Sequence, residues 1–344
     1  MFRIIGLAAI GLAAAIAGAQ SARAEGALHL YNWGEYINPE VLDKFSKEYG
    51  VEVSLDTYAS NEEMLAKIQA GATGYDIVFP SVHMNDIMLQ LGLLQETGVN
   101  KMPGFEQIDP AFLRTRNDPD ASYCLPYAWG TVGIFYNKQH VPEMTSWRQF
   151  FDYAAANPGK VTMLDDMREV LGVGLIMTGQ PVNSRDPEAI KAAEAFILAQ
   201  KPNIGAFTYE VLPLIESGDM HAAHWFVGAN LFVLREPDKY GYVVPAEGAT
   251  MYQENICLLK DAPNRDNALK FLEFFMRPEN SVLNTVQQTN GSVNFGAREL
   301  LPDDMKNNPN INPPAETMAK LQIFEDLGND LKLYDRSWTR IKTN

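Results

Sequence analysis

The sequence predicts an α/β protein of two lobes, each a mainly parallel sheet flanked by helices. Strand and helix patterns alternate from residue 27 to about residue 79, and a second alternation begins near residue 147. Alternation of this kind is typical of parallel sheets covered by helices. The chain has 344 residues, and a single hydrophobic core stops growing at about 250–300 residues. Two lobes are therefore expected.

The first 24 residues are expected to be a signal peptide that is cleaved after Ala24. Residues 1–3 include a basic side chain, residues 4–19 are almost uniformly apolar, and residues 22–24 have the small-x-small form of a signal-peptidase site. A retained anchor is the alternative, but this apolar run is shorter than the roughly 20 residues of a membrane span. The mature chain would begin at Glu25, not at the cysteine of a lipoprotein, so we expect an exported, periplasmic protein.

Strands and helices are expected to alternate over residues 27–79. Hydrophobic alternation marks the strands, while capping residues and apolar stripes mark the helices. The predicted elements are a strand at 27–33, a helix from Asn38-Pro39 to Gly50, a strand at 51–55, a helix opened by the Ser60/Glu63 capping pair, and a strand at 75–79.

The second alternation follows a long strand-like stretch at 123–136. Its predicted strands lie at 160–164, 221–227, 240–245 and 252–259. Its predicted helices lie at 147–156, from 167 onward, at 187–199, at 268–276 and at 281–288. The stretch from 302 to 314, rich in Asn, Pro and Asp, is expected to be a loop.

Composition narrows the classes of function. Lys and Arg number 28 against 43 Asp and Glu, giving a formal net charge of −15, and 46% of residues are hydrophobic. This is ordinary globular composition. Nucleic-acid binding is not expected, because neutralising phosphates needs an excess of clustered Lys and Arg. Cationic partners suit the charge better.

Motifs for enzymes and metals are missing from the mature sequence. It contains no G-x-S-x-G, no G-x-x-x-x-G-K-[ST] and no G-x-G-x-x-G. Asp166 and Glu169 are too close in sequence to straddle a glycosidic bond. His221 and His224 would point to opposite faces of a strand. We therefore expect no enzyme activity, no cofactor and no metal.

Ligands of open parallel sheets bind beyond the carboxyl ends of the strands. Carboxylates and aromatic rings dominate the residues expected there, a combination that suits an organic ammonium ion. Each residue taken alone could instead be core or a helix cap, and Asp166 with Glu169 fits a cap as well as a ligand clamp. The candidates are Trp33, Gly34, Glu35, Tyr36, Ser81, His83, Asp166, Glu169, Trp225, Tyr252 and Glu254.

Four motifs in order carry a family resemblance. They are residues 30–36 (LYNWGEY), 75–81 (YDIVFPS), 125–130 (LPYAWG) and 165–170 (DDMREV). In these motifs the chain resembles the spermidine/putrescine-binding periplasmic proteins of ABC transporters, from about residue 27 to the C-terminus.

The resemblance implies a type II-like periplasmic binding protein fold whose lobes are joined by crossover strands. The first lobe would comprise residues 25–131 and about 256–300, and the second about 132–255 and 301–344. Such a protein is expected to be a monomer that closes on a polyamine, of the putrescine or spermidine class, and delivers it to an inner-membrane ABC permease complex.

The family's ligand contacts fall on the candidates named above, with the second-lobe aromatic at Trp225 or, allowing a gap, Phe226. Several positions depart from the pattern. Gly34 replaces a hydroxyl residue, His83 a phenol, Tyr252 an indole and Glu254 an Asp, while Phe324 stands where an amide contacts ligand. These changes leave the choice of polyamine open.

Other solutes are alternatives within the same fold. An ω-amino acid such as γ-aminobutyrate could use His83 or Arg168 for its carboxylate. Ferric ion would need more Tyr or His ligands than these positions supply. A secreted hydrolase ranks last because a nucleophile motif is missing.

The two cysteines, Cys124 and Cys257, lie on the two stretches that the resemblance makes crossover strands. They could form a disulfide in an oxidising periplasm, or they could be two separate buried thiols.

Overall fold

A computed structural model describes residues 26–72 and 74–343. The predicted signal peptide lies outside these residues. Among the residues that the structure describes, no helix has both the length and the apolar character needed to cross a membrane.

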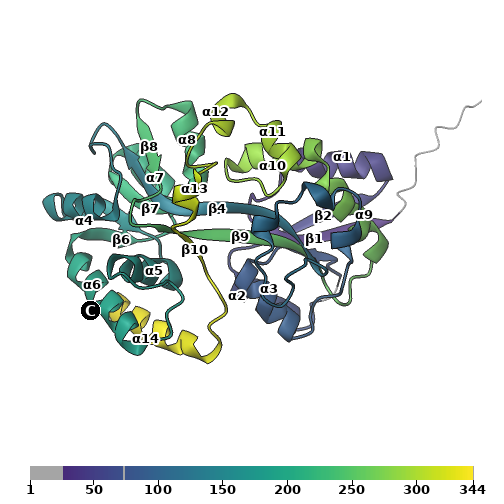
Figure 1. The fold of residues 1–344 in the computed structure, drawn as a ribbon, viewed down its shortest axis with the longest axis horizontal. Coiled ribbons are helices and arrows are strands. Elements are labelled where there is room, and N and C mark those ends of the chain that lie inside the picture. Colours follow the sequence, from purple (N-terminus) through teal and green to yellow (C-terminus); the bar gives the residue numbers. More distant parts are fainter. Residues whose placement is uncertain (1–25, 73, 344) are drawn as a thin grey trace, which may run out of the picture.

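The fold is two-lobed and α/β, as predicted from the sequence. One sheet runs through both lobes in the order β2-β1-β3-β9-β4-β7-β5-β6. Strands β4 (Cys124–Asn137) and β9 (Ala249–Leu258) lie at its centre and cross between the lobes (Figure 1). β1 pairs in parallel with β2 and β3 on one side, and β5 with β6 and β7 on the other. The ladders that β4 and β9 make with each other, and with β3, β7 and β8, are antiparallel.

The elements before β4 build most of one lobe. They are β1 (Ala27–Trp33), α1 (Pro39–Tyr49), β2 (Glu52–Tyr58), α2 (Asn61–Gln69), β3 (Ile77–Val78), α3 (Val82–Gln90), η1 (Val99–Lys101), η2 (Phe105–Gln107) and η3 (Pro110–Phe112).

The elements between β4 and β9 build most of the other lobe. They are α4 (Trp147–Ala156), β5 (Val161–Met163), α5 (Met167–Met177), α6 (Pro187–Gln200), η4 (Lys201–Asn203), β6 (Ile204–Phe207), α7 (Val211–Ser217), β7 (Ala222–Phe226), η5 (Val227–Ala229), α8 (Asn230–Arg235) and β8 (Tyr240–Val243).

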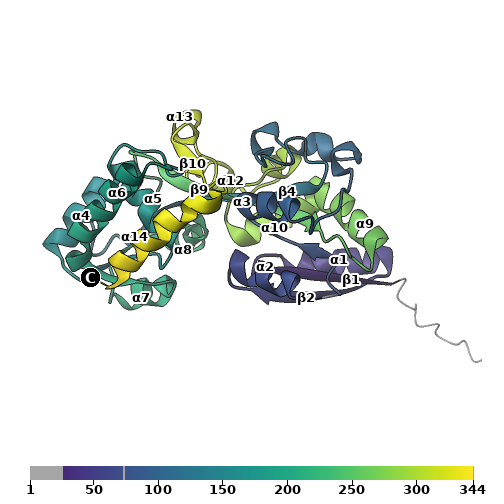
Figure 2. The same cartoon turned by 90° about the horizontal axis from the view of Figure 1, so that it is seen from below.

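The chain after β9 returns to both lobes. It forms α9 (Arg265–Met276), α10 (Pro278–Gln288), α11 (Phe295–Glu299), α12 (Asp303–Lys306), α13 (Ala315–Met318), β10 (Leu321–Ile323), η6 (Gly328–Asp330) and α14 (Leu331–Thr343). Figure 2 shows α9 and α10 with the elements of the first lobe and α14 along α5 and α6 of the second.

Local chemistry explains the predicted helices that the structure confirms. Asn38 caps α1 by accepting a hydrogen bond from the Glu40 amide, Pro39 begins the helix, and Gly50 ends it with a φ of 64°. Helix α4 occupies the predicted residues 147–156 and begins at a Ser146 cap. The prediction of a loop over 302–314 is wrong in part, because α12 lies within it.

Hydrophobic cores follow the two lobes. Phe45 of α1 packs with Phe271 and Phe274 of α9 in one cluster, whereas Trp147 and Tyr334 belong to another. The sequence-based lobe boundaries, 25–131 with about 256–300 and 132–255 with 301–344, stay a proposal that this packing supports.

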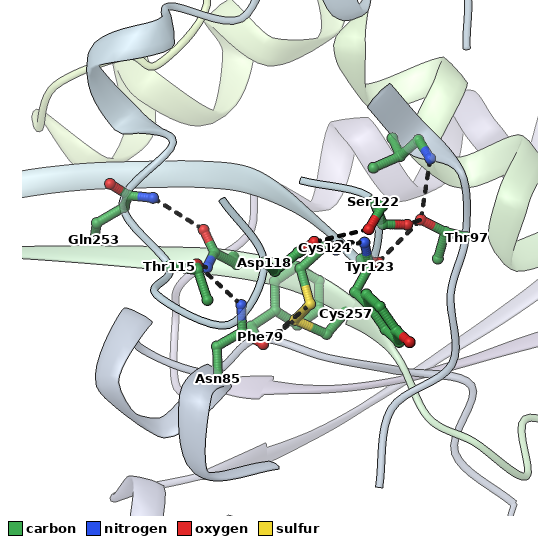
Figure 3. The surroundings of a disulfide bond; sticks show 12 residues. Phe79, Asn85, Thr97, Thr115, Asp118, Ser122, Tyr123, Cys124, Gln253 and Cys257 are labelled. Carbon is green, nitrogen blue, oxygen red and sulfur yellow. Dashed lines mark hydrogen bonds between the residues drawn. A yellow bond between two sulfur atoms is a disulfide. The ribbon is translucent and has the colours of Figure 1, made fainter. Parts of the chain in front are cut away.

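Cys124 and Cys257 are direct partners in the β4–β9 ladder, with Cα atoms 4.5 Å apart, and form a disulfide. Of the two states left open by the sequence, the structure therefore has the bridge. Asp118 fixes the start of β4 beside it, since its carboxylate accepts hydrogen bonds from the amides of Tyr123 and Cys124 (Figure 3).

Candidate functional site

Glu254 of β9 is a buried carboxylate between the lobes. Its Oε1 accepts a hydrogen bond of 3.1 Å from the Ser81 hydroxyl, and its Oε2 accepts one of 3.2 Å from the Tyr36 hydroxyl. Within the described residues it has no Lys, Arg or His in hydrogen-bonding or ion-pairing distance. Burial raises the pKa of Glu254 to about 8, and the two hydroxyl groups only partly offset this. An ammonium ion would supply the missing counter-charge.

Ser81 is held where β3 leads into α3. Its backbone bridges to Glu254, and its hydroxyl accepts a hydrogen bond of 3.0 Å from the Asn61 amide. The hydroxyl does not cap α3 and can therefore donate to the Glu254 carboxylate.

Aromatic rings line the same region. Trp33 donates from Nε1 to the Phe79 carbonyl over 2.8 Å and packs on Tyr58, with ring centroids 4.8 Å apart. Desolvation keeps the pKa of Tyr36 well above its usual range, so this phenol remains a neutral donor. Ring faces and a buried carboxylate together favour a cation.

Tyr252 extends this wall along β9. Its ring lies 5.8 Å from that of Phe226 in an edge-on arrangement, and burial raises its pKa. A Cβ atom at Gly130, its partner on β4, would collide with the Tyr252 hydroxyl. The absence of a side chain at Gly130 therefore leaves room for the Tyr252 ring.

The two aromatic residues at the end of β7, Trp225 and Phe226, point to opposite faces of the sheet. Phe226 pairs with Val132, which pairs with Thr250, so all three share one face of the sheet with Tyr252 and Glu254. Trp225 points to the other face, where its ring lies 6.4 Å from that of Tyr209.

Gly34 and Glu35 lie in the exposed turn after β1. Glu35 has a φ of 55°, and its carbonyl accepts a hydrogen bond from Gln288. A side chain at Gly34 would meet open space. These two predicted contacts are therefore at the solvent side of the site and apart from the Glu254 carboxylate.

Asp166 is the N-cap of α5, in agreement with the capping alternative. Its Oδ1 accepts from the amides of Arg168 and Glu169 at 2.8 and 2.9 Å, and its Oδ2 accepts from the Tyr209 hydroxyl at 3.1 Å. The side chain is half-buried. Its hydrogen-bond partners among the described residues are neutral, and the nearby charge of Arg168 interacts with it without a hydrogen bond between the two side chains.

Glu169 lies deeper, on the first turn of α5. It accepts a hydrogen bond of 2.6 Å from the Thr250 hydroxyl, and its Oε2 is 3.6 Å from Nε2 of His224. Burial raises its pKa, while His224 and Thr250 act in the opposite direction.

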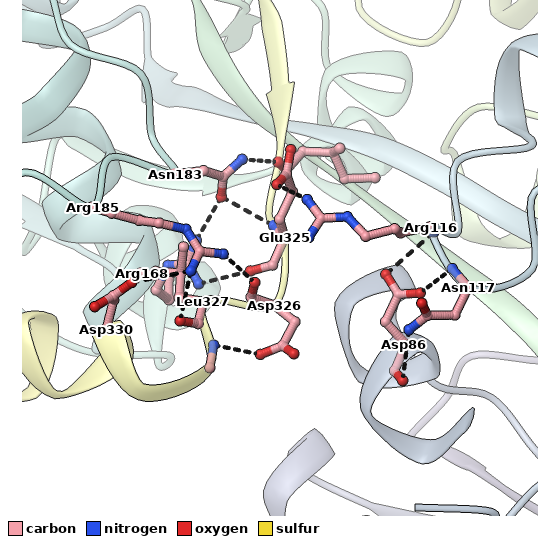
Figure 4. A network of polar contacts seen from close by, with 12 residues as sticks. Asp86, Arg116, Asn117, Arg168, Asn183, Arg185, Glu325, Asp326, Leu327 and Asp330 are labelled. Carbon is pink, nitrogen blue, oxygen red and sulfur yellow. Dashed lines mark hydrogen bonds and ion pairs between the residues drawn. The ribbon is translucent and has the colours of Figure 1, made fainter. Parts of the chain in front are cut away.

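A polar network connects the lobes beside the site (Figure 4). Arg116, between η3 and β4, forms a 2.7 Å ion pair with Glu325, between β10 and α14. Arg168 donates to the Glu325 carbonyl and to Asn183 Oδ1, and its guanidinium lies over the Phe324 ring at 4.5 Å. Arg168 thus holds the segment that carries Phe324.

His83 lies half-buried at the start of α3. Burial, reinforced by the positive charge of Arg168, lowers its pKa to about 4. It is therefore neutral at physiological pH.

Four residues that complete the site were not among the predicted ligand contacts: Tyr209, Thr250, Asn290 and His224, which the sequence analysis weighed only as a metal ligand. Asn290 donates to the Tyr36 hydroxyl at 3.4 Å, and its Oδ1 is buried without a partner among the described residues. Tyr209 lies next to no recognisable motif, and Thr250 could have been found from its alternation with Tyr252 and Glu254. Within the described ranges, no cluster of three or more His, Cys, Asp or Glu side chains is placed to hold a metal ion.

Comparisons with known proteins find relatives that match this chain over most of its length. The sequence model of a family described as bacterial extracellular solute-binding protein matches residues 40–313. The putrescine-binding periplasmic protein SpuD of Pseudomonas aeruginosa is 32% identical over 98% of this chain and 97% of its own length.

Solved structures are similar over the same extent. The spermidine/putrescine ABC transporter substrate-binding protein PotD of Streptococcus pneumoniae has a TM-score of 0.84 and 33% identity, covering 92% of this chain and 98% of its own. A GABA receptor structure has a TM-score of 0.74 and 17% identity, covering 92% of this chain and 98% of its own. At that identity the likeness is one of fold alone.

Proposed function

Because the chain belongs to the bacterial extracellular solute-binding protein family, we propose that it captures a polyamine between its lobes and delivers it to an ABC import permease. The observation that carries the proposal is Glu254, a buried carboxylate whose hydrogen-bond partners are the neutral hydroxyls of Ser81 and Tyr36.

A polyamine matches this site chemically. One ammonium group would pair with Glu254, where a buried charge without a partner is costly and a charge-assisted hydrogen bond is strong. The methylene chain would pack against Tyr252 and Phe226. A second ammonium would meet Asp166, whose Oδ2 accepts a hydrogen bond from the Tyr209 hydroxyl alone among the residues that the structure describes.

The remaining predicted residues have supporting places in this proposal. Trp33 and Tyr36 would form the first-lobe wall, Ser81 would orient Glu254, and His83 would face the ligand from α3. Trp225 would act through Tyr209, and Glu169 would line the floor of the second lobe. Gly34 and Glu35 would border the entrance.

The ω-amino-acid alternative needs a cation for the ligand's carboxylate. Arg168 is engaged with Glu325, Asn183 and Phe324, and the lowered pKa of His83 keeps it neutral. A polyamine is therefore favoured over γ-aminobutyrate.

We propose that the protein acts in the periplasm after cleavage at Ala24, as a monomer and without catalytic activity, cofactor or nucleic-acid partner. The similarity of the chain to the putrescine-binding periplasmic protein SpuD and to the ABC transporter substrate-binding protein PotD supports a membrane permease as the protein partner.

Thermal melting of the mature protein tests the proposal. A ligand at about 100 times its Kd adds roughly 2.7 kcal/mol to the free energy of unfolding, which raises Tm by a few degrees. The panel is putrescine, cadaverine, spermidine, spermine, agmatine and γ-aminobutyrate. We expect a rise with at least one polyamine, whereas a rise with γ-aminobutyrate alone would overturn the ligand class.

Binding should also release a proton. With a pKa of about 8, Glu254 is mostly protonated at pH 7 in the free protein, and an ammonium ligand needs it ionised. Amines with a pKa near 10 stay charged throughout. Affinity should therefore rise by between one and two powers of ten from pH 6 to pH 8 and then level off.

Calorimetry at pH 7 in two buffers of different ionisation enthalpy measures the proton directly. We expect close to one proton released per ligand. The pKa of His83, about 4, excludes it as the source. A pH-independent affinity with no proton release would contradict the assignment of Glu254.

A further inference from the structure

The second-lobe carboxylate Glu169 already has a basic partner inside the protein. His224 of β7 is fully buried, its Nε2 lies 3.6 Å from Oε2 of Glu169, and its ring is nearly perpendicular to that of Trp147, with centroids 5.2 Å apart. Neither ring nitrogen has a hydrogen-bond partner in the part of the chain that the structure describes. Glu169 is thus the group with which this imidazole is paired.

Register places the pair on the ligand side of the sheet. His224 and Phe226 alternate onto one face of β7, and Phe226 shares that face with Thr250, Tyr252 and Glu254 through Val132. Glu169 accepts the Thr250 hydroxyl at 2.6 Å. Thr250, the β9 residue that Glu169 contacts, is four residues from Glu254. At about 3.3 Å per residue of strand, the two positions are about 13 Å apart.

The carboxylates of the site differ in whether the protein supplies a basic partner. Glu254 and Asp166 have only neutral hydrogen-bond donors. Glu169 faces His224 at 3.6 Å, so a basic side chain of the protein already lies where an ammonium group would pair with this carboxylate. Glu35 is exposed, and exposed ion pairs contribute little because water screens them. The positive charge of Arg168 also interacts with Asp166 and Glu169. The enclosed site therefore offers at most two carboxylates, Glu254 and Asp166, to a cationic ligand.

We propose that His224 is the protein's own counter-ion to Glu169, so that the site selects a diamine over a triamine. The inference rests on the proposed function and deepens it. The middle or third ammonium of a triamine would enter the enclosed region without a carboxylate, and an unpaired buried charge is strongly disfavoured. His224 is a specificity-determining residue that acts through Glu169.

Calorimetric titration of the full mature protein with putrescine and with spermidine tests this inference. For the wild type we expect putrescine to bind at least tenfold more tightly. In His224→Gln the amide keeps a donor near Glu169 but removes the basic group, so the Kd ratio should move at least tenfold toward spermidine. His221→Gln is the matched control, because His221 stacks on His140 and bonds Tyr153; its ratio should equal that of the wild type.

A ratio in folded His224→Gln within threefold of the wild-type value would overturn the inference, as would a wild type that prefers spermidine. If His224→Gln does not fold, His224→Asn replaces it, since the smaller amide removes the same basic group. The Kd ratio should again move at least tenfold toward spermidine, and a folded His224→Asn with the wild-type ratio would overturn the inference. A wild type that binds no amine overturns the proposed function as well, whereas spermidine preference overturns this inference alone.

Discussion

Replacing Glu254 by Gln should weaken polyamine binding by about 100-fold or more. The variant keeps the size of the side chain and can still accept a hydrogen bond from Ser81 or Tyr36, but it removes the charge that an ammonium would meet. Truncating one partner of a buried charge pair costs about 2–5 kcal/mol, and each 1.4 kcal/mol is a factor of ten in Kd. Calorimetry with the polyamine that binds the wild type measures the loss.

The same variant should be more stable than the wild type without ligand at pH 8 and above. The folded-state pKa of Glu254, about 8, is above the ordinary value of 4.5. The stability that this group contributes is therefore fully present below about pH 4.5 and is lost as pH rises through about 8. Gln at this position stays neutral and avoids that loss.

Glu52→Gln is the matched control, since Glu52 is an exposed glutamate in β2 of the same lobe. It should leave both affinity and stability within error of the wild type. Wild-type affinity in Glu254→Gln would refute the site assignment, even if the protein proves to bind polyamines elsewhere.

Strong local patterns allowed much of the fold to be predicted. Strand alternation and caps fixed β1, α1, β2, α2 and α4 within a few residues. Helix α3 was missed because it is buried on several sides: Val82, Met84, Asp86 and Met88 leave no single apolar stripe. Helix α14 did carry a signal, since Leu331, Tyr334, Trp338 and Ile341 recur at helical spacing.

Site residues could be predicted from the sequence where they lie at or near the end of a strand. Glu254, Ser81 and Tyr36 meet as the strand-end rule and the family resemblance require. The partner of Glu169 was not predictable, because His224 reaches it only through the pairing of β7 with β4. Similarly, the face of Phe226 depends on a register that the sequence does not specify.

Removing the disulfide by Cys124→Ala/Cys257→Ala should destabilise the protein without affecting ligand binding. The bridge closes a loop with a sequence separation of 133 residues, and for loops of this size the expected loss is about 2–5 kcal/mol in the free energy of unfolding. Tm should fall by several degrees, measured by calorimetry or circular dichroism. Wild-type protein kept reduced should show a fall of the same sign.

Binding should remain within about threefold of the wild type in the same variant. Cys257 is three residues from Glu254, so strand alternation directs the two side chains to opposite faces of β9. The sulfur atoms pack instead in the cluster of Tyr31, Val78 and Met88. An unchanged Tm would show that the bridge does not restrain the unfolded chain, whereas a tenfold loss of affinity would show that it positions Glu254. We expect lower stability together with unchanged binding. That result would show that the disulfide stabilises the crossover strands without shaping the ligand site on the same strands.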